Sequence, residues 1–172
     1  MTVAQEHRDR APETLGFALL TVSDTRTPAD DESGRRARAA VEAAGHHVVE
    51  ALVVRDETAA IRQALGAVLA RTDVDVVVVT GGTGIAPRDV TIEAVEPLLD
   101  RTLPGFGELF RMLSYRDIGA AAMLSRATAG VAEGRAVFAL PGSPAAVDLA
   151  LAELVLPEAG HVVAQARRGR TG

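Results

Sequence analysis

The chain has no cysteine among its 172 residues. Without a thiol it can form no disulfide, no thiolate nucleophile and no thiolate metal site. It also has no lysine, so all 18 of its basic residues are arginine. Schiff-base and pyridoxal-phosphate chemistry, Walker-type phosphate binding and covalent nucleotidyl-lysine intermediates need a lysine amine and are excluded. Phosphoryl chemistry in this chain would depend on backbone donors, arginine, hydroxyl groups and metal.

The chain also has fewer basic than acidic residues, 18 against 23, and it lacks long apolar runs. The net charge is -5 at pH 7, which argues against a nucleic-acid partner. No segment has about 18 uninterrupted apolar residues, and the start of the chain lacks the apolar centre of a signal peptide. We therefore expect a cytoplasmic protein with no membrane segment. We expect one domain over residues 15–164, a disordered tail at 1–14 and a disordered basic tail at 165–172.

Strands and helices alternate along the predicted domain. Apolar runs predict strands at 17–23, 47–54, 74–80, 125–131 and 136–140. Apolar residues at helical spacing predict helices at 33–44, 58–70, 104–115 and 145–156. Thr91 is expected to cap a further short helix, which Pro97 would limit. This alternation predicts an α/β fold of three layers, with a mainly parallel sheet and helices on both of its faces.

The most informative stretch runs from residue 76 to residue 91. Four consecutive valines lead into Gly81, Gly82, Thr83 and Gly84, and Asp89 follows. The valines fit a strand buried on both faces, and the glycines let backbone N–H groups approach a phosphate closely. A carboxylate beside such a loop repels a phosphate unless a cation lies between them. The loop and the acid together predict a metal-bound nucleotide.

Polar and small residues also follow the neighbouring strands. In parallel sheets ligands bind beyond the carboxyl ends of the strands. We therefore expect one site that also contains Ser23, Asp24, Asp56, Pro141, Gly142 and Ser143. Other readings stay open, because Asp24 and Ser143 also suit helix caps, Asp56 suits a loop, and the glycines suit a tight turn. The glycine spacing fits neither G-x-G-x-x-G nor the Walker pattern.

Seven motifs, taken in order, resemble one known family. They are TVSDTR at 21–26, SG at 33–34, TGGTG at 80–84, APRDVT at 86–91, PGFGELFRMLSY at 104–115, MLSRATAGV at 123–131 and LPGSP at 140–144. Over about residues 15–160 the chain is similar to the MoaB/MogA molybdenum cofactor biosynthesis proteins and to the G domain of gephyrin. The run GFGELFRMLSY looks more like the MoaB branch.

The resemblance implies molybdopterin adenylyl transfer, in which the terminal phosphate of molybdopterin attacks the α-phosphate of ATP and releases pyrophosphate. It implies that Asp56 and Asp89 are catalytic and bind Mg²⁺. It assigns substrate binding to Ser23, Asp24, Gly81, Gly82, Thr83, Gly84, Ser114, Pro141, Gly142 and Ser143. Ser125 is a further candidate for the pterin. Arg88 is placed to stabilise transition-state charge, although it also suits an ordinary surface position.

The same resemblance implies a homotrimer, or a hexamer, and leaves room for a separate molybdenum insertase as a partner. One departure is that Ala145 stands where family members usually carry lysine. The retained Asp56 and Asp89 favour an active adenylyltransferase. The missing lysine and the MoaB-like helix favour a non-catalytic carrier or assembly protein that binds pterin or nucleotide. A nucleotide-binding sensor is a third hypothesis, supported by the glycine loop alone.

Overall fold

The structure is a computed structural model that describes residues 12–168. Six strands form one sheet in the order β2-β1-β3-β6-β5-β4. They are β1 (Gly16–Val22), β2 (His47–Val54), β3 (Val76–Thr80), β4 (Arg101–Thr102), β5 (Thr128–Ala132) and β6 (Arg135–Leu140). The pairs among β2, β1, β3 and β6 are parallel, whereas β5 and β4 join the sheet antiparallel. The prediction of a mainly parallel sheet is confirmed.

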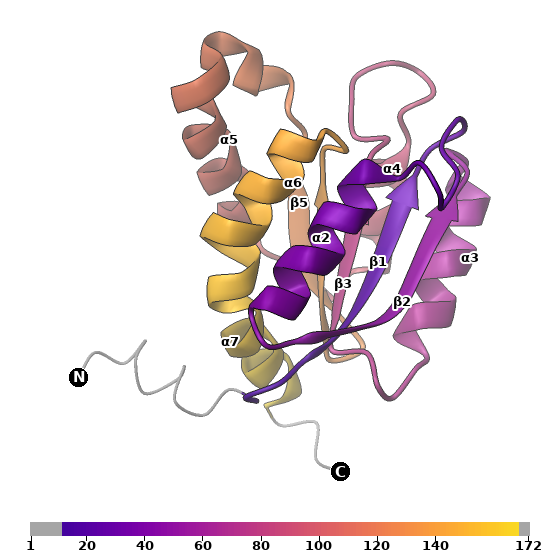
Figure 1. Ribbon diagram of the computed structural model, residues 1–172, viewed down its shortest axis with the longest axis vertical. Helices are drawn as coiled ribbons and strands as arrows, with labels where there is room; N and C mark the ends of the chain where they lie inside the picture. The colour runs from indigo at the N-terminus through magenta and orange to yellow at the C-terminus, as the bar shows by residue number, and fades with distance from the viewer. Residues whose placement is uncertain (1–11, 169–172) are drawn as a thin grey trace.

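Helices cover both faces of this sheet (Figure 1). They are α2 (Glu32–Ala43), α3 (Thr58–Leu69), α4 (Thr91–Val95), α5 (Pro104–Ile118), α6 (Pro144–Ala150) and α7 (Leu156–Arg167). Short 3₁₀ segments follow α4 at Glu96–Leu98 and α5 at Gly119–Leu124, and a π-helical turn at Leu151–Val155 joins α6 to α7. Helices α2, α5, α6 and α7 pack on one face, and α3 and α4 on the other. The three-layer α/β prediction is confirmed.

Strand β3 shows why the valine run marks the centre of the sheet. Val76 and Val78 belong to the core beneath α2 and α6, while Val77 and Val79 belong to the core beneath α3 and α4. All four valines are fully buried. Side chains alternate between the faces of a strand, so a strand covered on both sides needs apolar residues at every position. Because the valine strand β3 ends at Thr80, the glycine loop that follows lies at the carboxyl edge of the sheet.

Two local features differ from the sequence expectations. Thr91 is the first residue of α4 and not its cap: Val90 holds the N-cap position, and no side chain caps this helix. The Thr91 hydroxyl is buried and has no hydrogen-bond partner among the described residues. Strand β4 was not predicted, because two exposed edge residues carry no readable pattern. The limit set by Pro97 is confirmed, since α4 gives way to a 3₁₀ turn at Glu96.

The end of the described chain also differs from prediction. The last predicted helix ended at residue 156, whereas α7 runs from Leu156 to Arg167 and was not predicted. Residues 165–167 are therefore helical, and the prediction of a disordered tail is wrong for them. The helix persists because Ala159 and Val163 are buried against the core and the Arg167 guanidinium lies 2.5 Å from Asp75. Residues 12–14 and 168 are described and belong to no helix or strand, and the remaining parts of the predicted tails, 1–11 and 169–172, lie outside the described residues. Within residues 12–168 no helix combines the length and apolarity needed to cross a bilayer.

Candidate active site

The loops after β1, β3 and β6 meet at the carboxyl edge of the sheet, the end toward which the β1 and β2 arrows point in Figure 1. The Gly81 N–H donates to the Leu140 carbonyl over 3.1 Å. A Cβ atom added to Gly142 would lie 2.8 Å from the Gly81 Cα atom. Gly81 itself has φ +92° and packs against the Val22 carbonyl oxygen. Because these backbones are in contact, side chains at either glycine would force the loops apart.

A depression of about 440 Å³ lies between these loops. Its lining comprises Thr21 and Val22 at the end of β1 with Ser23, Thr25 and Arg26 after it, Thr80 at the end of β3 with Gly81 and Gly82 after it, and Gly142 and Ser143 after β6. Five of the residues predicted for substrate binding thus face one hollow: Ser23, Gly81, Gly82, Gly142 and Ser143. Three loops that are far apart in the sequence converge here.

The predicted acidic residues are coupled beside this depression. An Asp24 carboxylate oxygen accepts the backbone N–H of Asp56 over 3.0 Å, and the same carboxylate pairs with Arg88. Partial burial raises the pKa of Asp56, and the carboxylates of Asp89 and Asp24 raise it further, while the Val90 N–H and Arg88 oppose them. Asp24, Asp56 and Asp89 therefore share one electrostatic environment with an excess of negative charge.

The glycine loop shapes the surroundings of both predicted catalytic carboxylates. Asp89 Oδ2 accepts the Ala86 N–H over 3.0 Å, which folds the loop back on itself. A Cβ atom on Gly84 would lie 2.5 Å from that Oδ2 atom. A Cβ atom on Gly82, whose φ is +60°, would lie 2.7 Å from Asp56 Oδ1. The carboxylates occupy space that only glycine leaves open.

The carboxylates beside the glycine loop could hold a magnesium ion only together with further oxygen ligands. Within residues 12–168 no three or more His, Cys, Asp or Glu side chains are grouped to hold a metal ion. Mg²⁺ prefers oxygen ligands and usually takes one or two carboxylates, completing its shell with phosphate oxygens and water. Burial is the main cause of the raised pKa of Asp56, and the carboxylates of Asp89 and Asp24 add negative charge that a cation would neutralise. Asp56 and Asp89 could therefore hold Mg²⁺ together with a phosphorylated ligand.

Several predicted residues have structural partners that the sequence left open. Ser143 Oγ accepts the Ala146 N–H over 3.3 Å and caps α6. Ser23 Oγ accepts the Arg26 N–H over 3.1 Å and shapes the turn after β1. Asp24 is not the cap of α2, since Asp31 fills that role. Thus Ser143 has the capping role considered for it, and Asp24 does not.

Not all of the predicted substrate-binding residues line the depression. Ser114 is buried on α5 and Thr83 is buried in the glycine loop. Pro141 is half-buried beside Gly142, and Gly84 lies against Asp89. Helix α5 does reach the same end of the molecule as the glycine loop (Figure 1). A pterin role for Ser114 stays a prediction.

Arg126, which was not predicted as a site residue, bridges the two ends of the glycine loop. Its guanidinium donates to the Thr83 carbonyl over 3.0 Å and to the Asp89 carbonyl over 3.2 Å, and it pairs with Glu93. The hydrogen bond from Arg126 holds the pKa of Glu93 below its usual value. Arg126 lies within a motif that carried the family resemblance, but its 43-residue separation from Thr83 hides the contact.

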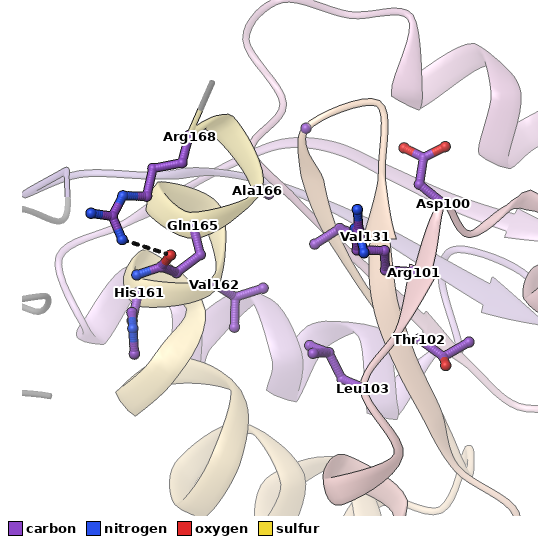
Figure 2. A pocket seen from close by; sticks show the side chains of 11 residues that line it. Asp100, Arg101, Thr102, Leu103, Val131, His161, Val162, Gln165, Ala166 and Arg168 are labelled. Carbon is purple, nitrogen blue, oxygen red and sulfur yellow. Dashed lines mark hydrogen bonds between the residues drawn. The ribbon is translucent and has the colours of Figure 1, made fainter. Parts of the chain in front are cut away.

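A larger hollow of about 660 Å³ lies elsewhere, between β4 and α7. Figure 2 shows Arg101 and Leu103 on one side of it and His161, Val162 and Gln165 of α7 on the other. Its lining residue Val131 pairs with Ala136 at the start of β6, the end opposite the glycine loop. No residue predicted for the site lines it. The residues predicted for the site therefore lie at the smaller depression and not at the larger hollow.

A glycine-lined depression at the carboxyl edge of a parallel sheet, with carboxylates beside it, defines an α/β protein suited to a phosphorylated ligand. The sequence model of one family, described as "probable molybdopterin binding domain", matches residues 18–161. The chain belongs to this family, as its motifs predicted.

Relatives narrow the assignment to one branch. The chain is 50% identical to molybdenum cofactor biosynthesis protein B of Bacillus subtilis over 167 residues, which cover 96% of this chain and 98% of the relative. Its counterpart in Halalkalibacterium halodurans is 48% identical, with the same two coverages. The sequence resemblance to MoaB is confirmed, and the chain is a molybdenum cofactor biosynthesis protein of this branch.

Solved structures agree with this assignment. A crystal structure of molybdenum cofactor biosynthesis protein B has a TM-score of 0.89 at 48% identity and covers 92% of this chain and 99% of that one. The tungsten cofactor synthesizing protein MoaB from Pyrococcus furiosus has a TM-score of 0.78 at 38% identity, covering 91% of this chain and 99% of that one. The predicted MoaB/MogA-like fold is confirmed.

Proposed function

We propose that this chain is a molybdopterin adenylyltransferase that joins the terminal phosphate of molybdopterin to the AMP part of ATP and releases pyrophosphate. The observation that carries the proposal is the depression between the loops at Gly81 and Gly142, with Asp56 and Asp89 packed against the glycine loop. Transfer of this kind requires in-line positioning and neutralisation of charge more than a covalent nucleophile. A chain without lysine or cysteine can meet both requirements.

Each group in the site has a distinct task in this proposal. The backbone N–H groups of Gly82, Thr83 and Gly84 bind nucleotide phosphates, because the glycines let a ligand approach them closely, whereas the Gly81 N–H already donates to the Leu140 carbonyl. Asp56 and Asp89 would hold Mg²⁺ through their carboxylates. A bound Mg²⁺ would supply positive charge beside the phosphates. Arg126 keeps the ends of the loop together, so that Asp89 stays beside Gly84.

A second candidate is a carrier that binds pterin or nucleotide without turnover. Ala145 favours it, since this exposed residue follows Ser143 and supplies no cation. Arg88 is also committed to Asp24. Under this hypothesis the depression binds the ligand, but transition-state charge is not stabilised.

One assay separates the two candidates. Purified protein is incubated with molybdopterin, ATP and Mg²⁺, and adenylyl-molybdopterin and pyrophosphate are quantified by chromatography. The enzyme proposal expects both products in equal amounts, and none when EDTA removes the metal. A folded protein that binds molybdopterin and forms neither product would be the carrier instead.

We also propose that the chain assembles as a homotrimer, with a hexamer as the alternative. Helix α5 and the 3₁₀ segment after it expose most of the large apolar side chains on the described surface: Leu109, Met112, Tyr115, Ile118, Met123 and Leu124. Met112 is 51% exposed and Tyr115 is 64% exposed. Apolar patches of this kind mark protein contacts. The cytoplasmic location and the insertase partner stay predictions.

A further inference from the structure

Three arginines border the candidate site, and they differ in how far their donors are already used. Arg88 pairs with Asp24 and is 63% exposed. Arg126 pairs with Glu93 and donates to two loop carbonyls. The third, Arg26, is the arginine that lines the depression. It is therefore the cation best placed to meet a ligand there.

Hydrogen bonds hold both the backbone and the guanidinium of Arg26 in place. Its backbone N–H donates to Ser23 Oγ over 3.1 Å. Its Nη1 atom donates to Ser33 Oγ over 3.2 Å and to the Gly142 carbonyl over 3.4 Å. Within residues 12–168, Nε and Nη2 make no hydrogen bond, and the side chain is 34% exposed. The guanidinium is thus anchored by one nitrogen while two nitrogens keep their donors uncommitted.

The charge of Arg26 is only partly compensated by its surroundings. The nearest carboxylate, Asp31, lies 3.7 Å from Nη1. Asp31 is buried, and its oxygens accept the Thr21 hydroxyl over 2.6 Å and the Gly34 N–H over 2.9 Å. The direct hydrogen-bond acceptors of Arg26 are neutral. The positive charge of Arg26 therefore faces a depression that is also lined by Gly81, Gly82 and Gly142.

We propose that Arg26 binds a phosphate group of the substrate in this depression. Its free donors can form charge-assisted hydrogen bonds with phosphate oxygens, for which the planar guanidinium is well suited. It would supply the cation that Ala145 cannot. The inference rests on the proposed function for the identity of the phosphate, but not for the presence of an anion site.

The test measures binding without turnover. Isothermal titration calorimetry with inorganic pyrophosphate, and separately with ATP, is performed in Mg²⁺ buffer on the wild type, Arg26→Gln, Arg26→Lys and Ser33→Ala. Loss of a charge-assisted bond predicts that Arg26→Gln weakens affinity for either probe by about 10- to 100-fold. Arg26→Lys should retain part of the wild-type affinity. In Arg26→Gln the affinity for either probe should depend less on salt concentration than in the wild type.

Ser33→Ala distinguishes binding from loop support. It removes the hydroxyl that accepts from Arg26 and donates to the Gly142 carbonyl over 2.7 Å, but it keeps the guanidinium. Affinity near that of the wild type in Ser33→Ala supports the proposal. If Ser33→Ala weakens binding as much as Arg26→Gln, or if Arg26→Gln binds normally, or if the wild type binds neither probe, the proposal is wrong. A wild type that binds pyrophosphate through Arg26 but forms no adenylyl-molybdopterin would refute the enzyme and keep the anion site.

Discussion

The Asp24 carboxylate accepts the backbone N–H of Asp56 over 3.0 Å and so ties the loop after β1 to the loop after β2. The same carboxylate pairs with Arg88 from the loop after β3. One side chain therefore connects three loops at the edge of the sheet. The arrangement places Asp56 near two other carboxylates, Asp24 and Asp89, whose charges raise its pKa in addition to the effect of burial.

This raised pKa predicts a pH-dependent effect of Asp56→Asn on stability. Folding favours the protonated carboxyl of Asp56, so its contribution is fully present below the ordinary aspartate pKa of about 3.9 and is lost as pH rises through the higher folded value. At pH 7 the ionised group is destabilising. Asp56→Asn should therefore raise Tm at pH 7, and thermal scans should show the gain shrinking toward pH 3. An equal Tm change at both pH values would contradict the electrostatic origin.

The same shift predicts how activity depends on pH. Metal binding requires ionised Asp56, so turnover should fall on the acid side at a higher pH than an ordinary aspartate would give. Asp24→Asn removes one of the charges that raise this pKa. The acid limb of kcat/KM should then move to lower pH, provided that residual turnover is measurable. An unmoved limb would mean that Asp24 does not act on Asp56.

Gly82 tests the packing of the glycine loop. With φ at +60° and Asp56 Oδ1 only 2.7 Å from a built Cβ atom, Gly82→Ala has both backbone strain and a steric clash. We expect the free energy of unfolding to fall by at least about 1–2 kcal/mol, and the free energy of nucleotide binding to fall by more than that. The matched control is Gly66→Ala in α3, where no atom lies within 4 Å of the added Cβ. That substitution should stabilise the protein by about 0.5–1 kcal/mol in chemical denaturation.

Variants of Arg126 test whether its hydrogen bonds to Thr83 and Asp89 hold the glycine loop in its conformation. Arg126→Gln cannot reach Thr83, Asp89 and Glu93 together, so the segment 83–89 should lose protection in hydrogen exchange and turnover should fall by about 10-fold or more. Glu93→Gln is the control, because it removes the ion pair but leaves both bonds to the loop carbonyls. Its effect should be smaller. Equal exchange rates in Arg126→Gln and the wild type would show that the loop holds its shape unaided.

Features of this protein that depend on local sequence patterns were predictable, whereas contacts between particular residues far apart in the sequence were not. The valine run and the periodic helices encode their own burial, so the layers and most of the strands and helices were predictable, although α7 was not. The loops after β1, β3 and β6 were also predictable as one cluster, since parallel strands place their ends together. Arg126 and the β4 edge were not, because the first depends on contacts between distant segments and the second is only two residues long.

The exposed apolar face of α5 predicts the assembly state. Light scattering on the wild type should give a mass of three or six times 17.9 kDa. Met112→Lys should lower that mass, because burial of a charge in an apolar contact is unfavourable. Leu52→Ser is the control, since Leu52 is also an exposed apolar residue, at 37%, but lies on edge strand β2. A monomeric wild type would rule out the proposed trimer.

In the proposed function, Asp89 serves adenylyl transfer and is not needed for binding molybdopterin. Single-turnover formation of adenylyl-molybdopterin from ATP in the wild type and in Asp89→Asn, with molybdopterin binding measured on the same samples, examines this role of Asp89. We expect rapid product formation by the wild type and none by Asp89→Asn, with molybdopterin affinity almost unchanged. Product formation by Asp89→Asn at the wild-type rate would show that Asp89 has no part in the transfer.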